Sequence, residues 1–191
     1  MTDIKEYFNN SAKIIETLSD HESEINQICE EIVNSNKLGK KILVAGNGGS
    51  CSDSEHFVGE LQCTYKKSDR KPYSAFSLSS LPAALTAWSN DFGFNTYFKR
   101  QVQAHGKEGD ILFIISTGGG NEQNGASMSL VEAVKEAQKN KLKIFALLGK
   151  SGGLIKGMAD IKIIVKSDVT SHIQEAHIAI LHCICEKLES Y

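Results

Sequence analysis

Arginine is scarce in this chain, and the scarcity limits the partners that it can bind. Only two arginines are present, Arg70 and Arg100, and the formal net charge at pH 7 is −2. Proteins that bind nucleic acid neutralise its phosphate backbone with clustered Lys and Arg side chains. Because the sequence has no such basic stripe, we expect no nucleic acid among its direct ligands.

Long apolar runs and cysteine pairs are also absent. No stretch approaches the roughly 18 apolar residues of a membrane span, and the polar residues 1–6 lack the apolar core of a signal peptide. The five cysteines are an odd number without a Cys-x-x-Cys pair, which is typical of reduced thiols. These features predict a cytoplasmic protein without a membrane partner and without disulfides.

Two nucleotide-binding patterns are missing from the most informative stretch, residues 41–60. Residues 41–45 are apolar and predict a buried strand, residues 46–49 (Gly-Asn-Gly-Gly) predict a tight turn, and Ser50 would begin a helix. The third spaced glycine of a dinucleotide fingerprint and the Gly-Lys-Ser/Thr ending of a Walker loop are both lacking. The unpaired N–H groups where the helix begins favour a phosphate or another oxyanion. The stretch therefore predicts an anion site and argues against a dehydrogenase.

Apolar segments alternate with helical ones after residue 40. With 191 residues, of which 41% are hydrophobic and 23% charged, the chain has the composition of one ordinary globular domain spanning residues 1–191. We expect strands at residues 41–45, 73–78, 110–116, 142–148 and 160–165. Helices are expected at residues 122–140 and from Thr170, as an N-cap, to near the C-terminus, among others. The alternation predicts an α/β fold with a doubly wound parallel sheet of five strands, covered by helices on both faces.

The first 40 residues carry apolar side chains at helical spacing and predict two helices before the first strand. Such helices have an apolar face that must be covered. They can pack on a neighbouring subunit or on the sheet of their own chain, and the sequence leaves both arrangements open.

A second strand-to-helix turn repeats the glycine chemistry of the first. Residues 116–121 read Ser-Thr-Gly-Gly-Gly-Asn and follow the strand predicted at residues 110–116. Ligands of doubly wound sheets bind beyond the carboxyl ends of the strands, near the point where the strand order reverses. Both glycine loops fall at such ends, so we expect ligand binding there.

Polar side chains interrupt two of the predicted helices. His56 and Glu60 are four residues apart on one helix face, where they could share a metal or a proton, or simply form a solvated pair. On the last helix, Gln174 and His182 can converge on one target, whereas His177 lies among the apolar residues and is expected to pack. From composition alone, His182 is more simply a satisfied histidine at the edge of the apolar stripe.

Compared together, these pieces resemble one family. The matching motifs are Ala45-Gly46-Asn47-Gly48-Gly49-Ser50, Asp53, His56-Phe57, Glu60-Leu61, Asn90-Asp91-Phe92-Gly93-Phe94, Ser116-Thr117, Gly149-Lys150, Gly152-Gly153, Ile173-Gln174-Glu175, His177 and His182. In this order they resemble the sugar isomerase (SIS) family, and within it the phosphoheptose isomerases, over nearly the whole chain.

The resemblance implies a fold, an assembly and a cofactor. The expected fold is the SIS-type parallel sheet of five strands, and the expected assembly is a homotetramer with active sites at subunit interfaces, in which residues 1–40 serve oligomerisation. One zinc ion per subunit is expected, with ligands His56, Glu60, Gln174 and His182.

The resemblance also implies an activity. Phosphoheptose isomerases interconvert D-sedoheptulose 7-phosphate and D-glycero-D-manno-heptose 7-phosphate through an enediolate, the first step of activated heptose biosynthesis for lipopolysaccharide or capsule. Glu60 is the expected base at carbon and His182 the acid that serves the oxygens, while zinc would polarise the oxygens. The matching substrate-binding positions are Asn47, Gly48, Gly49, Glu60, Asn90, Asp91, Ser116, Thr117, Gly118, Asn121 and Gln174.

Some positions depart from the family pattern. Gly118 and Asn121 stand where the usual Ser-Thr-Ser-Gly-x-Ser loop has serines, and Glu122 adds a negative charge nearby. The two missing hydroxyls are expected to weaken phosphate binding by about 1–2 kcal/mol. His172 replaces the arginine that usually precedes Ile-Gln-Glu.

Two alternatives are compatible with the same fold. One is a SIS isomerase of another ketose phosphate, such as a hexulose phosphate, against which the expected zinc ligands argue. The other is a non-catalytic tetrameric scaffold that binds a bacterial replication initiator protein. The presence of both Glu60 and His182 argues against the scaffold, because paired acid and base residues indicate catalysis.

Overall fold

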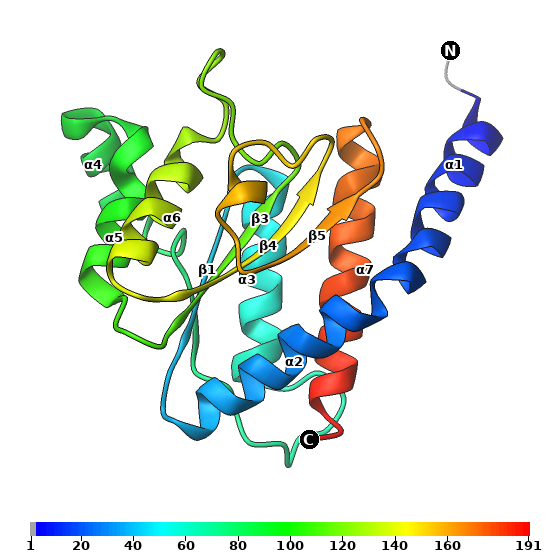
Figure 1. The fold of residues 1–191 in the computed structure, drawn as a ribbon, viewed down its shortest axis with the longest axis horizontal. Coiled ribbons are helices and arrows are strands. Elements are labelled where there is room, and N and C mark those ends of the chain that lie inside the picture. The colour runs from blue at the N-terminus through cyan, green and yellow to red at the C-terminus, as the bar shows by residue number, and fades with distance from the viewer. Residues whose placement is uncertain (1–2) are drawn as a thin grey trace.

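The computed structural model describes residues 3–191, which form helices around a single parallel sheet (Figure 1). The strands are β1 (Ile42–Gly46), β2 (Ala75–Ser77), β3 (Ile111–Ser116), β4 (Lys143–Gly149) and β5 (Ile161–Val165). They lie in the order β2-β1-β3-β4-β5, and all neighbouring pairs are parallel. The predicted parallel sheet of five strands is therefore confirmed.

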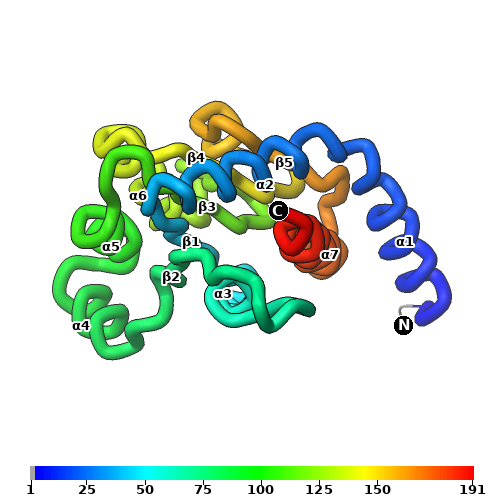
Figure 2. Tube along the Cα trace, turned by 90° about the horizontal axis from the view of Figure 1, so that it is seen from below, coloured from blue at the N-terminus to red at the C-terminus, as the bar shows by residue number. Residues whose placement is uncertain are grey.

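Helices cover both faces of this sheet. The helices are α1 (Ile4–Glu16), α2 (Glu22–Lys37), α3 (Gly49–Gln62), α4 (Pro82–Phe92), α5 (Tyr97–His105), α6 (Met128–Lys139) and α7 (Thr170–Leu188), with 3₁₀ turns η1 (Thr17–His21), η2 (Phe94–Thr96) and η3 (Ile155–Gly157). Figure 2 shows α4, α5 and α6 on one side of the sheet and α3 and α7 on the other. The layers are those of a doubly wound fold.

Successive residues of β1 enter the two cores in turn. Ile42 and Val44 pack with α2, α3 and α7, whereas Leu43 and Ala45 pack with α5 and α6. All residues of β1 and of β3 are buried. Burial on both faces explains why these strands read as continuous apolar runs rather than as alternating patterns.

The two N-terminal helices behave differently. Ile25, Ile28 and Ile32 of α2 are buried in the core of their own chain, so α2 packs on its own sheet. By contrast, α1 runs beside α7 and leaves Ile4 and Phe8 exposed, at 75% and 65% of their surface. Of the two arrangements that the sequence left open, α2 takes the intramolecular one, and α1 keeps an uncovered apolar face.

A carboxylate on α7 holds α1 in place. Tyr7 donates a hydrogen bond of 2.5 Å to Glu175 Oε1, and the hydroxyl of Ser11 donates to Oε2. Burial would raise the pKa of Glu175, but these two hydrogen bonds and the nearby His172 hold it below its ordinary value. The contact joins α1 to the first turns of the helix that carries Gln174 and His182.

The helix predicted at residues 122–140 begins later than expected, and this prediction was wrong for its first turns. The helix α6 starts at Met128, and the preceding residues form a loop that projects beyond the sheet (Figure 1). Within it, the side-chain carbonyls of Asn121 and Asn124 accept backbone N–H groups two residues ahead. Such turns compete with helix formation and explain the late start.

Two further boundaries differ from the prediction. Thr170 is the first residue of α7 and not its N-cap, which is Val169 and makes no side-chain capping bond. The Val169 N–H instead donates to Ser167 Oγ at 3.1 Å. The edge strand β2 is shorter than residues 73–78, because the Tyr73 N–H bonds the carbonyl of Leu61 and not the neighbouring strand.

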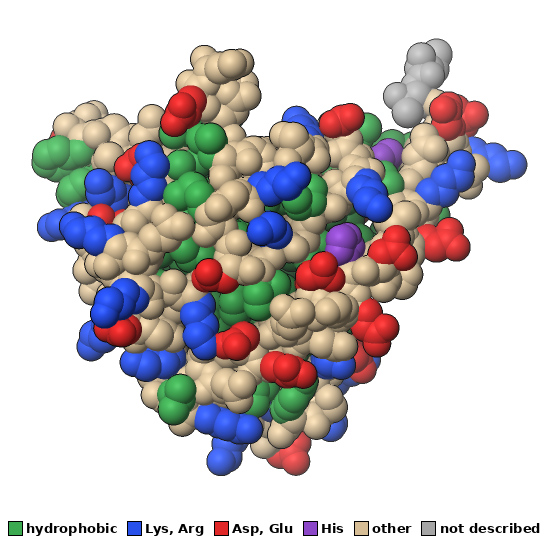
Figure 3. Space-filling model, in the orientation of Figure 1, with side chains coloured by type: hydrophobic (Ala, Val, Ile, Leu, Met, Phe, Trp, Pro, Cys, Tyr) green, Lys and Arg blue, Asp and Glu red, His purple; other side chains and the backbone are tan. Residues whose placement is uncertain are grey.

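The surface carries charges of both signs. On the face drawn in Figure 3, basic and acidic side chains are interspersed, without a large area of one sign. Among residues 3–191, no helix has the length and apolar character that crossing a membrane requires.

Candidate active site

Two loops meet where the strand order reverses. In a sheet of order β2-β1-β3-β4-β5, this point lies between β1 and β3, and every residue of β1 pairs with β3. The chain leaves β1 into α3 and leaves β3 into α6, and these helices cover opposite faces. Both glycine loops therefore lie at the carboxyl ends of adjacent strands, as the sequence predicted.

The loop after β1 leaves little room for a side chain at two positions. A Cβ atom at Gly46 would lie 2.3 Å from the carbonyl oxygen of Ser50, and one at Gly49 would lie 2.4 Å from Nε2 of Gln174. Gly48 has a φ of 57°, in the left-handed region that favours glycine. The tight turn thus brings the start of α3 against the amide of Gln174 on α7, so Gly49 and Gln174 share one location.

Asn47 connects the first loop to the start of α6. Its Nδ2 donates a hydrogen bond of 3.2 Å to Oγ of Ser129, a side chain that is only 1% exposed. Ser129 was missed from the sequence, because the helix was expected to begin several residues earlier. The contact fixes the side chain of Asn47 between the two glycine loops.

The candidate proton-transfer residues lie together on α3 and α7. Nε2 of His56 is 3.1 Å from Oε1 of Glu60 and 3.4 Å from Nε2 of His182. The two imidazole rings meet edge to face, with centroids 5.1 Å apart. Glu60 and His182 therefore both reach His56, although 122 residues separate them in the sequence (182 − 60). The side chains of His56 and Glu60 keep 46% and 25% of their surface exposed.

The chemistry of this group fits a metal ion, but its arrangement is not that of a metal centre. Nε2 of His56 lies next to both Oε1 of Glu60 and Nε2 of His182, and imidazole and carboxylate are common zinc ligands. The amide of Gln174 is a less usual ligand. Across residues 3–191, no three His, Cys, Asp or Glu side chains are arranged so that they could hold a metal ion.

Asp53 is a half-buried residue of α3, three residues before His56. Its Oδ2 atom is buried without a hydrogen-bond partner. Burial raises the pKa of Asp53, and the nearby His56 opposes the rise. Asp53 belongs to the matching motifs, but an unpaired carboxyl oxygen there could not be predicted from the sequence, since burial depends on the packing of other helices.

The second glycine loop lines a cavity of about 180 Å³. Its lining residues are Gly118, Gly120, Asn121, Asn124, Ala126, Ser127, Lys150, Ser151 and Gly153. Lys150 brings a positive charge to this lining, and it is not among the binding residues that the sequence predicts. At Gly118 a Cβ atom would meet nothing within 4 Å, so the position faces open space.

Ser116 and Thr117 start this second loop. The hydroxyl oxygen of Ser116 accepts the N–H of Gly119 at 3.0 Å and so shapes the turn. Thr117 is half-buried beside it. The cavity lining includes neither side chain.

Asn90 and Asp91 lie apart from these groups. They are exposed on α4, where Asn90 donates a hydrogen bond of 2.9 Å to Asp91 Oδ1. Both views place α4 at the opposite flank of the chain from α7 (Figures 1 and 2). Within one chain the structure does not bring Asn90 or Asp91 to Glu60 and His182.

Comparison with known proteins identifies the family. A model of the SIS domain matches residues 6–149. The chain is 38% identical to a phosphoheptose isomerase of Campylobacter concisus over 91% of this chain and 89% of that protein. It is 45% identical to a phosphoheptose isomerase of Leptospira biflexa over 83% of this chain and 78% of that protein.

Solved structures of phosphoheptose isomerases are also similar to this chain. The structure of a phosphoheptose isomerase from Francisella tularensis is similar with a TM-score of 0.90 at 36% identity, covering 98% of this chain and 97% of that one. Phosphoheptose isomerase from Neisseria gonorrhoeae gives a TM-score of 0.89 at 32% identity, again over 98% and 97% of the two chains. The matching motifs, the sheet order and these similarities together mean that the chain belongs to the SIS domain family and, within it, to the phosphoheptose isomerases.

Proposed function

We propose that this protein is an aldose-ketose isomerase that converts D-sedoheptulose 7-phosphate to D-glycero-D-manno-heptose 7-phosphate. The observation that carries the proposal is the meeting of Glu60 and His182, from separate helices, at His56. Relatives that share more than a third of their residues with this chain over most of its length are named phosphoheptose isomerases. The reaction is the first step of activated heptose biosynthesis.

The reaction moves protons and needs no second substrate. The base Glu60 removes a proton from C1 of the ketose while the acid His182 gives one to the carbonyl oxygen at C2, which produces the enediol. Return of a proton to C2 and loss of one from the oxygen at C1 then yields the aldose. The contact of both side chains with His56 supports their action on one sugar.

The phosphate of the sugar is proposed to bind at the second glycine loop. Backbone N–H groups of a glycine-rich turn can cradle an anion without hydroxyl groups. The cavity of about 180 Å³ and the ammonium group of Lys150 support this assignment, and Lys150 offsets in part the serines that Gly118 and Asn121 replace. Thr117 lies at the same strand end and is proposed to contact the phosphate from the sheet side.

Zinc is the proposed cofactor, one ion per subunit, with His56, Glu60, Gln174 and His182 as ligands. When bound, zinc polarises the sugar's oxygens as a Lewis acid. Two imidazoles and a carboxylate that meet at His56 support the assignment, and these side chains would have to rearrange around the ion, because they are not already placed to hold one. Metal analysis tests the assignment independently of activity: we expect about one zinc per chain in the wild type and much less in His56→Ala. Equal zinc contents in the two proteins would show that His56 is not a zinc ligand.

A homotetramer is the proposed assembly, with each active site at a subunit interface. The remote position of Asn90 and Asp91 supports it, because they can reach the sugar only in a neighbouring subunit. The uncovered apolar face of α1 supports a role of that helix in assembly. The cytoplasm is the proposed location, and the five free cysteines are consistent with it.

The assay for the function is direct. Purified protein is incubated with sedoheptulose 7-phosphate, and the anomeric protons of the products are followed by NMR. We expect heptose 7-phosphate to accumulate, and faster than any product from a hexulose phosphate. If the wild type leaves sedoheptulose 7-phosphate unchanged, the proposed function is wrong. Binding of a replication initiator by such an inactive protein would favour the scaffold instead.

A further inference from the structure

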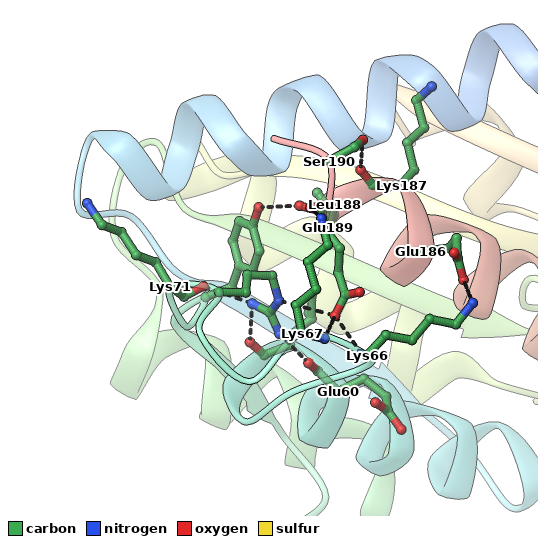
Figure 4. Close-up of polar contacts among 12 residues, drawn as sticks. Glu60, Lys66, Lys67, Lys71, Glu186, Lys187, Leu188, Glu189 and Ser190 are labelled. Carbon is green, nitrogen blue, oxygen red and sulfur yellow. Dashed lines mark hydrogen bonds and ion pairs between the residues drawn. The ribbon is translucent and has the colours of Figure 1, made fainter.

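An irregular segment contacts both of the helices that carry the proposed acid and base. Residues 63–74 connect α3 to β2 without forming a helix or a strand, and we call them the clasp segment. The segment runs past the C-terminal ends of α3 and α7. Figure 4 shows Lys66 and Lys67 reaching the last residues of α7, Lys66 at Glu186 and Lys67 at Glu189.

Arg70 caps the C-terminal end of α3. Its guanidinium donates to the carbonyl of Glu60 at 2.7 Å and to the carbonyl of Leu61 at 3.2 Å. Carbonyl groups in the last turn of a helix have no partner within the helix, and a cation there also complements the helix dipole. Arg70 thus fixes the backbone of the very residue whose carboxylate is the proposed base.

Glu189 holds the clasp segment from the other side. Its Oε1 accepts the backbone N–H groups of Lys66 at 2.6 Å and Lys67 at 2.9 Å, and it lies 4.0 Å from Nε of Arg70 (Figure 4). The side chains of Arg70 and Glu189 are only 9% and 5% exposed. Because both side chains are largely covered, this contact is screened less by solvent than a fully exposed pair.

The clasp segment also contacts the proposed acid. The ring of Tyr65 lies 5.9 Å, centroid to centroid, from that of His182. Tyr73, at the other end of the segment, donates to the carbonyl of Leu188 at 3.3 Å and packs under the guanidinium of Arg70. One short segment therefore touches the backbone of Glu60 and the imidazole of His182.

We propose that Arg70 and Glu189 are positioning residues that hold Glu60 and His182 in register for proton transfer. Neither side chain contacts the substrate in this proposal. Arg70 acts through the backbone of Glu60, and Glu189 acts by keeping Arg70 and Tyr65 in place. The proposal rests on the proposed isomerase function, and a displacement of about 1 Å in such a site can lower the rate by about 100-fold.

The test compares full-length Arg70→Gln, Arg70→Lys and Glu189→Gln with the wild type on sedoheptulose 7-phosphate. We expect kcat to fall about 10- to 100-fold in Arg70→Gln and Glu189→Gln, with KM changed less than about threefold, since no substrate contact is lost. Arg70→Lys should retain more activity, because lysine keeps the charge but cannot bridge two carbonyls.

A matched control separates positioning from stability. Asp110 is also a buried carboxylate that accepts two backbone N–H groups, from Lys41 and Lys107, and it precedes β3, at the opposite end of that strand from the second glycine loop. Asp110→Asn should lower the melting temperature without changing kcat. If the clasp variants lose no more kcat than Asp110→Asn, the proposal is overturned.

A second readout keeps the two proposals distinguishable. The Hε1 NMR resonance of His182, assigned with His182→Gln, should shift in Arg70→Gln and Glu189→Gln and stay in place in Asp110→Asn. A wild type that is inactive on the sugar refutes the proposed function, and the His182 resonance then tests the positioning role of Arg70 and Glu189 by itself. An unchanged resonance in both Arg70→Gln and Glu189→Gln would refute that positioning role.

Discussion

His177 illustrates how burial sets the protonation state of one residue. Its Nε2 lies 3.1 Å from the carbonyl oxygen of Leu148, which can only accept, so Nε2 carries the proton. The other ring nitrogen, Nδ1, is buried without a partner. A second proton would place an uncompensated charge in the core, and burial accordingly lowers the pKa of His177 from 6.5 to about 4.

This shift predicts a loss of stability in mild acid. The unfolded chain binds a proton at His177 near pH 6.5, whereas the folded chain binds it only near pH 4. The stabilising contribution is therefore complete above pH 6.5 and is lost as the pH falls through about 4, by about 3 kcal/mol in total. In His177→Gln, which can still donate to Leu148, urea unfolding at pH 7, 5.5 and 4 should show a flatter dependence.

The exposed His105 provides the control for this experiment. His105→Gln should keep the pH dependence of the wild type, because its imidazole is exposed to solvent. If His177→Gln and the wild type lose stability equally between pH 7 and pH 4, the buried imidazole does not cause the effect.

At the scale of single residues, the sequence predicted the side of a helix on which a residue lies better than the residues that it contacts. Helical spacing placed His177 among the apolar residues and allowed Gln174 and His182 to converge. It could not predict that His56 stands between Glu60 and His182, because a helical wheel describes one helix and not the neighbour that it meets. The unpaired Asp53 escaped prediction for the same reason.

Among the elements, the turn from β1 into α3 restricts the residue types at its positions most. We expect Gly49→Ala to fold, because the added Cβ meets only the end of the flexible Gln174 side chain, 2.4 Å away. Displacing that amide should lower kcat/KM for sedoheptulose 7-phosphate by about 10-fold, as expected for a misplaced group in an active site. Steady-state kinetics and thermal unfolding measure the two effects.

Gly59, in the same helix, serves as the matched control. A Cβ at Gly59 meets nothing within 4 Å, so Gly59→Ala should leave kcat/KM unchanged and stabilise α3 by about 0.5–1 kcal/mol. Full activity of Gly49→Ala would mean that the amide of Gln174 has no role in the site.

The sheet could be predicted at this scale because burial on both faces produces apolar runs. The late start of α6 could not, since Asn121 and Asn124 close local turns through their side chains where composition alone favours a helix. The C-terminal cap of α3 by Arg70 is also beyond sequence patterns, because ten residues separate the donor from Glu60 (70 − 60).

For the whole molecule, the apolar face of α1 carries the prediction about assembly. Phe8 is 65% exposed, and we expect it to be buried by another subunit. Phe8→Glu should convert the proposed tetramer to smaller species in sedimentation velocity and lower kcat, because Asn90 and Asp91 would no longer reach a neighbouring site. Glu6, on the same helix and already exposed, supplies the control substitution Glu6→Gln.

A fully active monomeric wild type would contradict that assembly. The sequence could predict two helices at residues 1–40, but it could not predict which of them packs on its own sheet, because both show apolar residues at helical spacing. Only the packing of α2 against the sheet, with Ile28 and Ile32 fully buried, leaves α1 as the exposed one.

The central claim is that Glu60 and His182 act together on one sugar, and a double-mutant cycle tests it most directly. We measure kcat on sedoheptulose 7-phosphate for Glu60→Gln, His182→Gln and the double variant. Residues that act as a unit give losses that do not multiply. We predict that each single variant loses at least about 100-fold and that the double variant loses little more. Losses that multiply, or a single variant with nearly full activity, would contradict the account.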